Sequence, residues 1–233
     1  CTKKDDVEDP SFARPGSAPK PVHVGVSSNS SAVTLSRDVL RKKIEAAVKV
    51  NSLIFRECGL KQLPEDAMQD GLLATLTSVD LSINRLTALP PSISVWRDVA
   101  KLNASDNLLG HLPDSILKLQ RLDKLVLSRN KLVALPVEIG GLRLTELKCD
   151  GNMLTTLPDD FDRDISSTLV ELDVSGNRLE NLPRSISKLN AIVRLYLQDN
   201  KLSDVDCLAR QTDGCLSHLQ YVNVANNQIN KIE

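Results

Sequence analysis

The stretch LDKLVLSRNKLVALP, residues 122–136, carries a pattern of leucines, one asparagine and one proline that recurs through the chain. In its segment Leu125–Val126–Leu127, side chains of an extended strand would alternate, so that both leucines point inward and Val126 points outward. Asn130 follows at the point where such a strand would bend away, and Pro136 ends the stretch. The pattern therefore predicts a short strand, a turn and a second, inward-facing segment.

Copies of this pattern follow one another at steps of 22 to 27 residues. A period in this range is typical of leucine-rich repeats, in which each repeat is one coil of a solenoid. The sequence therefore predicts an α/β leucine-rich-repeat solenoid, or horseshoe. It would have a parallel β-sheet on the concave face and short α or 3₁₀ turns on the convex face. The eight turn positions are Cys58, Asn84, Asn107, Asn130, Asn152, Asn177, Asn200 and Asn227.

Two further features of the repeat have clear structural purposes. We expect each turn asparagine to be buried and to bond backbone groups of its own and the adjacent coil, because those groups would otherwise be buried and unpaired. Six of the 11 prolines follow a leucine at the end of the pattern, where a fixed φ suits the start of a helical turn. Apolar residues three positions after such prolines are expected to return to the core: Ile93, Ile116, Ile139, Phe161 and Ile186.

The N-terminal segments differ from the repeats. Residues 1–33 are rich in proline and serine and bury too little apolar surface to offset the entropy of ordering, so we predict a disordered leader. In residues 34–50, Ser36 stands as an N-cap, and Leu40, Ile44 and Val48 recur at helical spacing. We predict a helix that caps the first coil, with a helix that binds a membrane surface or a partner as the alternative.

Residues 51–233 contain about eight repeats. The last of them stops without a segment that could cover its apolar edge, so a C-terminal cap is expected beyond Glu233.

Composition limits the compartment and the class of partner. A net charge of -1 favours neither nucleic acid nor an anionic membrane as the main partner, and no apolar run reaches the roughly 20 residues that span a bilayer. Two of the five cysteines, Cys58 and Cys149, fall on inward positions, which indicates a reducing compartment. Pairing of Cys207 with Cys215 remains an alternative.

Motifs that would support chemistry are weak. Asp160, Asp162, Asp164 and Glu171 have the spacing of calcium ligands in an EF-hand, but Ile165 replaces the required glycine and Glu171 falls on an expected strand. The three histidines have no metal-ligand spacing, and no phosphate-binding loop or nucleophile elbow is present. We therefore predict no catalytic residue, no metal and no cofactor.

The side chains expected on the concave face are the candidate site. They form columns across the coils, and the first column reads Ser52, Ser78, Lys101, Lys124, Glu146, Glu171, Arg194 and Tyr221. The third column reads Arg56, Ser82, Ser105, Ser128, Asp150, Ser175, Gln198 and Ala225. Two groups stand out as partner-binding: a basic patch of Lys101, Lys124, Arg129 and Lys148, and a C-terminal patch of Arg194, Tyr196 and Tyr221 beside Asp173. Tyrosine and arginine are enriched at binding hot spots.

Residues 40–66, LRKKIEAAVKVNSLIFRECGLKQLPED, and residues 79–93, VDLSINRLTALPPSI, resemble the small intracellular leucine-rich-repeat proteins of the Ras-group type. The resemblance covers residue 40 to the end. It implies a cytoplasmic, non-catalytic horseshoe without catalytic residues to transfer. Relatives of this type can begin with a myristoylation signal, and Met-Gly before Cys1 would read MGCTKK, so membrane association through a lipid anchor upstream stays open.

Together these features predict a protein that binds another protein on its concave face and acts as a scaffold or adaptor in signalling. One alternative is a regulatory subunit in a phosphatase or small-GTPase pathway. Less favoured are a calcium-dependent module and a fragment of a bacterial-type ubiquitin ligase, whose repeats step by about 20 residues.

Overall fold

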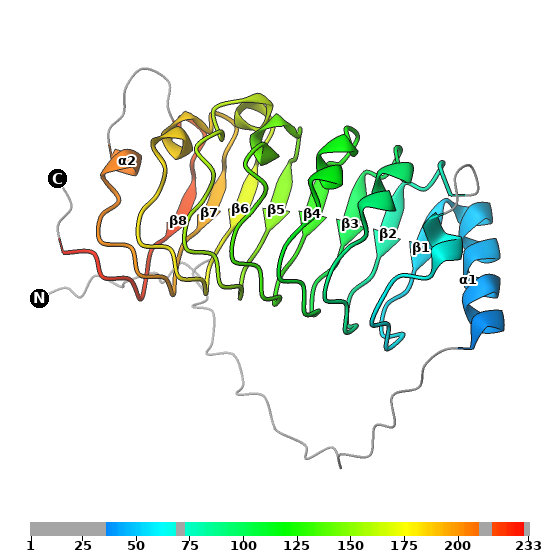
Figure 1. The fold of residues 1–233 in the computed structure, drawn as a ribbon. Helices are drawn as coiled ribbons and strands as arrows, with labels where there is room; N and C mark the ends of the chain where they lie inside the picture. Colours follow the sequence, from blue (N-terminus) through cyan, green and yellow to red (C-terminus); the bar gives the residue numbers. More distant parts are fainter. Residues whose placement is uncertain (1–35, 69–72, 210–215, 231–233) are drawn as a thin grey trace, which may run out of the picture. The chain divides into compact units, whose positions relative to one another are not determined.

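The computed structural model describes residues 36–68, 73–209 and 216–230. Within them, eight short strands form one parallel sheet in sequence order, and a short helix lies on the opposite side of each of the first seven coils (Figure 1). The solenoid predicted from the repeat period is thus confirmed. The strands are β1 (Ser52–Ile54), β2 (Ser78–Asp80), β3 (Lys101–Asn103), β4 (Lys124–Val126), β5 (Glu146–Lys148), β6 (Glu171–Asp173), β7 (Arg194–Tyr196) and β8 (Tyr221–Asn223).

The strands pair without any shift between repeats. Leu102 lies beside Leu125, and Leu125 lies beside Leu147, so the inward leucines stack in one row. All three are buried. The register follows from the sequence, because slipping a strand by one residue would turn its leucine outward.

Single 3₁₀ turns return the chain on the other side of six coils. Pro90, Pro113 and Pro183 directly precede three of them, in extended backbone conformation. All five apolar residues expected three positions after such prolines are fully buried. The 3₁₀ helices are η1 (Glu65–Met68), η2 (Pro91–Val95), η3 (Asp114–Lys118), η4 (Ile139–Gly141), η5 (Asp164–Ser167) and η6 (Arg184–Lys188); a short α-helix, α2 (Asp206–Ala209), follows β7.

A longer helix, α1 (Arg37–Val50), packs beside β1 at the first coil. Ser36 Oγ accepts a hydrogen bond from the Val39 amide, as an N-cap does. Ile44 and Ala47 are buried in the core, whereas Val48, expected to face inward, is exposed. The helix therefore turns a slightly different face to the coil than the apolar spacing predicts. The predicted leader, residues 1–33, lies outside the described residues.

In every coil the residue immediately before the turn position has a positive φ. Two are glycines, Gly151 and Gly176; the others are Glu57, Ile83, Asp106, Arg129, Asp199 and Asn226. Glycine adopts this conformation without strain, and Asn or Asp tolerate it. Ile83, at φ 56°, is the only β-branched residue among these eight, and a β-branched side chain is strained there.

Candidate functional site

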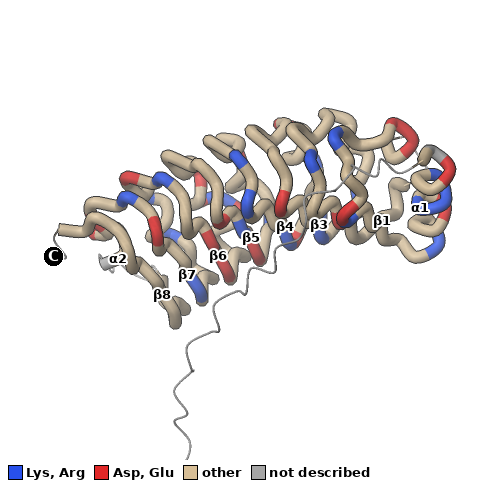
Figure 2. Tube along the Cα trace, turned by 90° about the horizontal axis from the view of Figure 1, so that it is seen from below, with Lys and Arg blue, Asp and Glu red and all other residues tan. Residues whose placement is uncertain are grey.

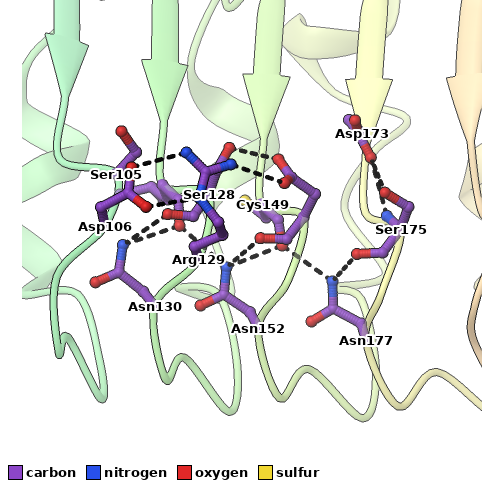
Figure 3. Close-up of polar contacts among 12 residues, drawn as sticks. Ser105, Asp106, Ser128, Arg129, Asn130, Cys149, Asn152, Asp173, Ser175 and Asn177 are labelled. Carbon is purple, nitrogen blue, oxygen red and sulfur yellow. Dashed lines mark hydrogen bonds and ion pairs between the residues drawn. The ribbon is translucent and has the colours of Figure 1, made fainter. Parts of the chain in front are cut away.

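The turn asparagines form a ladder that holds the coils together. Asn130 Nδ2 donates to Ala104 O of the preceding coil at 2.9 Å and to Leu127 O of its own coil at 3.0 Å. Its Oδ1 accepts from the Leu109 amide of the preceding coil at 3.0 Å. Figure 3 shows Asn130, Asn152 and Asn177 in the same arrangement in successive coils. Each amide therefore satisfies backbone groups that are buried away from water.

Coil one breaks this pattern for a physical reason. Its turn residue, Cys58, is preceded by α1 rather than by a coil, so an asparagine there would lack the neighbouring backbone groups that the ladder uses. Cys58 is buried, and its amide instead donates to Asn84 Oδ1 of the next coil at 3.0 Å. Burial raises the pKa of the Cys58 thiol, as it does that of Cys149. Both thiols are free, in agreement with their prediction as small apolar residues.

Outward-facing side chains of strands β4 to β7 form a series of alternating positive and negative charges. The carboxylate oxygens of Glu146 form ion pairs with Lys124 Nζ at 2.8 Å and with Lys148 Nζ at 3.0 Å. Glu171 continues the chain, with Lys148 at 3.0 Å and Arg194 at 2.6 Å. Figure 2 shows acidic and basic positions interleaved in this part of the sheet. Hereafter we call these five residues the charge chain.

The charge chain alters the ionisation of its carboxylates. Burial alone would raise the pKa of Glu146, but hydrogen bonds from Lys124 and Lys148 outweigh burial and lower it. Glu171 behaves alike: burial opposes ionisation, and hydrogen bonds from Lys148 and Arg194 lower its pKa. Lys148 bridges both carboxylates, and its pKa is raised despite the cost of burial.

A second ion-pair group lies near the turns. Arg129 donates from Nε and from a terminal guanidinium nitrogen to the two carboxylate oxygens of Asp106, at 2.6 and 2.7 Å, and its other terminal nitrogen lies 3.9 Å from Asp150 (Figure 3). The side-chain hydrogen bond from Arg129 lowers the pKa of Asp106.

These contacts show how the four cations of the predicted basic patch are paired. Lys124, Arg129 and Lys148 are all paired with carboxylates that the prediction left out, and within the described part of the chain only Lys101 of the four makes no ion pair. The missed partners, Glu146, Glu171 and Asp106, are visible in the sequence one coil away. Reading acidic and basic residues of neighbouring coils together would have found them.

A shallow hollow lies beside the charge chain. It has a volume of about 180 Å³ and lies where the chain enters β5 and β6. Its lining residues are Lys124, Thr145, Glu146, Val170, Glu171 and Arg194.

The two tyrosines meet at the C-terminal end of the sheet. Their rings are tilted at 46° with centroids 5.1 Å apart, which is a favourable aromatic geometry. The register places Tyr221 beside Arg194, and Tyr221 is 45% exposed. The tyrosine pair therefore forms an apolar surface on the same face as the charge chain.

Asp173, which lies between the charge chain and the tyrosine pair, forms hydrogen bonds with a residue close to it in sequence. Asp173 Oδ1 accepts from the Ser175 amide at 3.0 Å and from its hydroxyl at 2.6 Å (Figure 3). Burial raises the pKa of Asp173, and the Ser175 hydrogen bonds only partly oppose it. Ser82, Ser105 and Ser128, which the sequence places on the exposed face, are buried instead. The third column therefore lies partly beneath the surface.

The residues with EF-hand spacing do not converge. Asp160 Oδ2 accepts from the Gly140 amide, Asp162 pairs with Lys188, and Glu171 belongs to the charge chain. Across residues 36–68, 73–209 and 216–230, no three acidic, histidine or cysteine side chains are placed to hold a metal ion. Cys207 is a free thiol, and its suggested partner Cys215 lies outside the described residues. No helix in the described residues is long and apolar enough to cross a bilayer.

Parallel one-strand coils joined by an asparagine ladder define the class of this fold: it is a leucine-rich-repeat solenoid. The "Leucine rich repeat" family matches residues 74–132, and a second model of the same description matches residues 168–189.

Several known proteins share these repeats. The leucine-rich repeat and calponin homology domain-containing protein of Drosophila melanogaster is 33% identical over 163 residues, covering 70% of this chain and 20% of the relative. A leucine-rich-repeat protein of Leptospira interrogans superposes with a TM-score of 0.58 at 26% identity, over 83% of this chain and 59% of the other. The plant peptide hormone receptor RGFR1, solved in complex with RGF2, has a TM-score of 0.56 at 27% identity, over 71% and 30%.

The chain spans about a fifth of the length of the first curated relatives it matches. What it shares with them is therefore the repeat, a fold that generally serves protein–protein interaction.

Proposed function

We propose that this chain is a non-catalytic scaffold or adaptor that binds another protein through the exposed face of its sheet. One observation carries the proposal. Among the aromatic side chains of the described residues, Phe55, Trp96 and Phe161 are fully buried, whereas Tyr196 and Tyr221 pack together on the sheet's exposed face. A half-buried and an exposed tyrosine beside an arginine have the composition of a binding hot spot.

The polar groups of this face support binding rather than turnover. The carboxylates of the charge chain are ionised and ion-paired, with lowered pKa values, which is unsuited to a general base working near neutral pH. The likeness to RGFR1, a receptor solved with a peptide hormone, gives independent support for a protein or peptide ligand.

Finer aspects of the function rest on the sequence resemblance. Residues 40–66 and 79–93 resemble leucine-rich-repeat-containing protein 57, which favours action in the cytoplasm. A regulatory subunit of a phosphatase or small-GTPase pathway is the alternative. It would use the same face, and it would differ from an adaptor by changing the turnover of its bound partner.

Quantitative affinity purification tests the proposal. Purified chain is immobilised and exposed to isotope-labelled cell lysate, alongside the variant Tyr196→Ala with Tyr221→Ala. The control, Val133→Ala with Val137→Ala, removes exposed apolar surface elsewhere. We expect a defined set of proteins to be captured by wild type and control and lost by the tyrosine variant, at an unchanged melting temperature. Equal capture by all three would remove the tyrosine pair from the interface.

A further inference from the structure

We propose that the exposed face binds an extended peptide segment of the partner, aligned across the strands, with acidic residues at one end and a proline or aromatic ring at the other. The acidic end would contact Lys101 and Lys124, and the ring would pack on Tyr196 and Tyr221. This inference rests on the proposed function and specifies its ligand.

The binding elements lie on one line because of the strand register. Lys101 of β3 lies beside Lys124 of β4, and Arg194 of β7 lies beside Tyr221 of β8. All belong to the first column of outward side chains, so the line runs across the strands. A ligand that contacts both ends must therefore cross the sheet along the solenoid.

The charge on this line is unevenly distributed. Between β5 and β7, Glu146 and Glu171 are each bound by two cations, so that part of the line is internally neutralised. Lys101 is exposed and makes no ion pair within the described residues, and its neighbour in register is another cation, Lys124. Lys124 pairs with a single carboxylate, that of Glu146, which Lys148 also contacts, so cations exceed carboxylates at the β3–β4 end and make it the acidic subsite.

The line also has room for a side chain between its ends. The hollow of about 180 Å³ lies beside Glu146 and Glu171, with Val170 and Thr145 in its lining. Because the carboxylates there are already paired with Lys124, Lys148 and Arg194, the middle of the peptide is expected to be uncharged.

Strand spacing sets the length of the peptide. The Lys101–Lys124 pair and the Arg194–Tyr221 pair are four strand intervals apart. At about 4.8 Å per interval this is roughly 19 Å. An extended chain advances about 3.3 Å per residue, so the acidic group and the ring should be about six residues apart.

A single-stranded nucleic acid is the competing ligand, since it combines negative charge with rings. Its backbone, however, carries a charge at every nucleotide, and phosphates over the middle of the line would meet only cations that Glu146 and Glu171 already pair. A peptide that is charged at one end only needs no further cation there.

Selection from a phage-displayed library of random linear 12-residue peptides tests the inference on the whole chain. We expect enriched peptides to combine acidic residues with proline or an aromatic, about six positions apart. A peptide synthesised from the consensus should bind about tenfold or more weakly to Lys101→Glu with Lys124→Glu, and to Tyr196→Ala with Tyr221→Ala. Two matched controls should bind as wild type: Lys118→Glu with Lys131→Glu, and Val133→Ala with Val137→Ala.

Several outcomes would overturn the inference: no enriched peptide, enrichment without this spacing, binding unchanged in both variants of the line, or tighter binding of a twelve-nucleotide oligothymidylate than of the selected peptide. If the inference fails in one of these ways while lysate capture still depends on Tyr196 and Tyr221, the partner is a folded surface. In that case the proposed function stands without an extended ligand.

Discussion

Asn130 and Asn103 are the same residue type on neighbouring coils, but they lie on opposite sides of the backbone. Asn130 is buried and bonds backbone groups of two coils. Asn103 is on the exposed face, and its side chain accepts one hydrogen bond, from the Ser105 amide two residues away. The first joins coils to each other, whereas the second supports only a local turn. Inward positions are therefore constrained by the fold, and outward positions are free to carry specificity.

The largest expected effect is the loss of stability on replacing a buried turn asparagine. Asn130→Ala would leave several buried backbone groups unpaired, at about 1–3 kcal/mol each, so we expect it to lower the free energy of unfolding by about 3 kcal/mol or more. Asn103→Ala, the matched change, should lower it by less than about 1 kcal/mol. Urea denaturation measures both. Equal losses would show that the two sides of the strand do not differ as described.

The second effect concerns the charge chain. Lys148 contacts both Glu146 and Glu171, so Lys148→Met should cost about 1–2 kcal/mol at pH 7, between the values typical of surface and buried pairs. The exposed Lys118→Met on η3 is the control and should have little effect.

The charge chain also predicts a pH dependence. The pKa values of Glu146 and Glu171 are lowered in the folded state. Their contribution to stability is therefore present above the unfolded value of about 4.3 and is lost as pH falls through the folded pKa values. Wild type should lose more stability than Lys148→Met between pH 6 and pH 3. Parallel curves for the two proteins would argue that these ion pairs contribute nothing.

A smaller effect should raise stability. Ile83 occupies a position where φ is 56°, and the equivalent position of the last coil is Asn226. Asparagine tolerates this conformation, so Ile83→Asn should relieve strain and gain about 1 kcal/mol in the free energy of unfolding. Gly151→Ala is the reverse experiment: its Cβ would lie 3.2 Å from Arg129 Cγ at φ +64°, and stability should fall. A loss of stability in Ile83→Asn would mean that the partly exposed isoleucine packs more tightly than its position indicates.

The smallest effect distinguishes two neighbouring carboxylates of β6. Burial raises the pKa of Asp173, whereas that of Glu171 is lowered by its cations. The contribution of Asp173 therefore weakens as pH rises through its folded pKa. Asp173→Asn, which keeps an oxygen for the Ser175 hydrogen bonds, should be neutral or slightly stabilising at pH 7 in thermal melts. A clear loss in that variant would mean that the ionised carboxylate is needed.

Much of the fold could be predicted from the sequence because the same pattern of residues recurs in eight coils. The inward leucines, the turn asparagines and the prolines before the 3₁₀ turns each have the same function wherever they recur. By contrast, the ion pairs of Lys124 and Arg129 join residues 22 and 23 positions apart and appear only once the register aligns the coils. The burial of Ser128 and the contact from Trp96 Nε1 to Ala67 O depend on side-chain packing that no repeat pattern encodes.

A substitution scan read by protein abundance in the cytosol, through a protein-fragment complementation reporter, tests the division between inward and outward positions most directly. The account predicts that most substitutions at Asn107, Asn130, Asn152 and Asn177 deplete the protein. Those at Lys101, Lys124, Arg194 and Tyr221 should leave its abundance near that of wild type. Equal depletion in the two sets would contradict the claim that the exposed columns are free to serve binding.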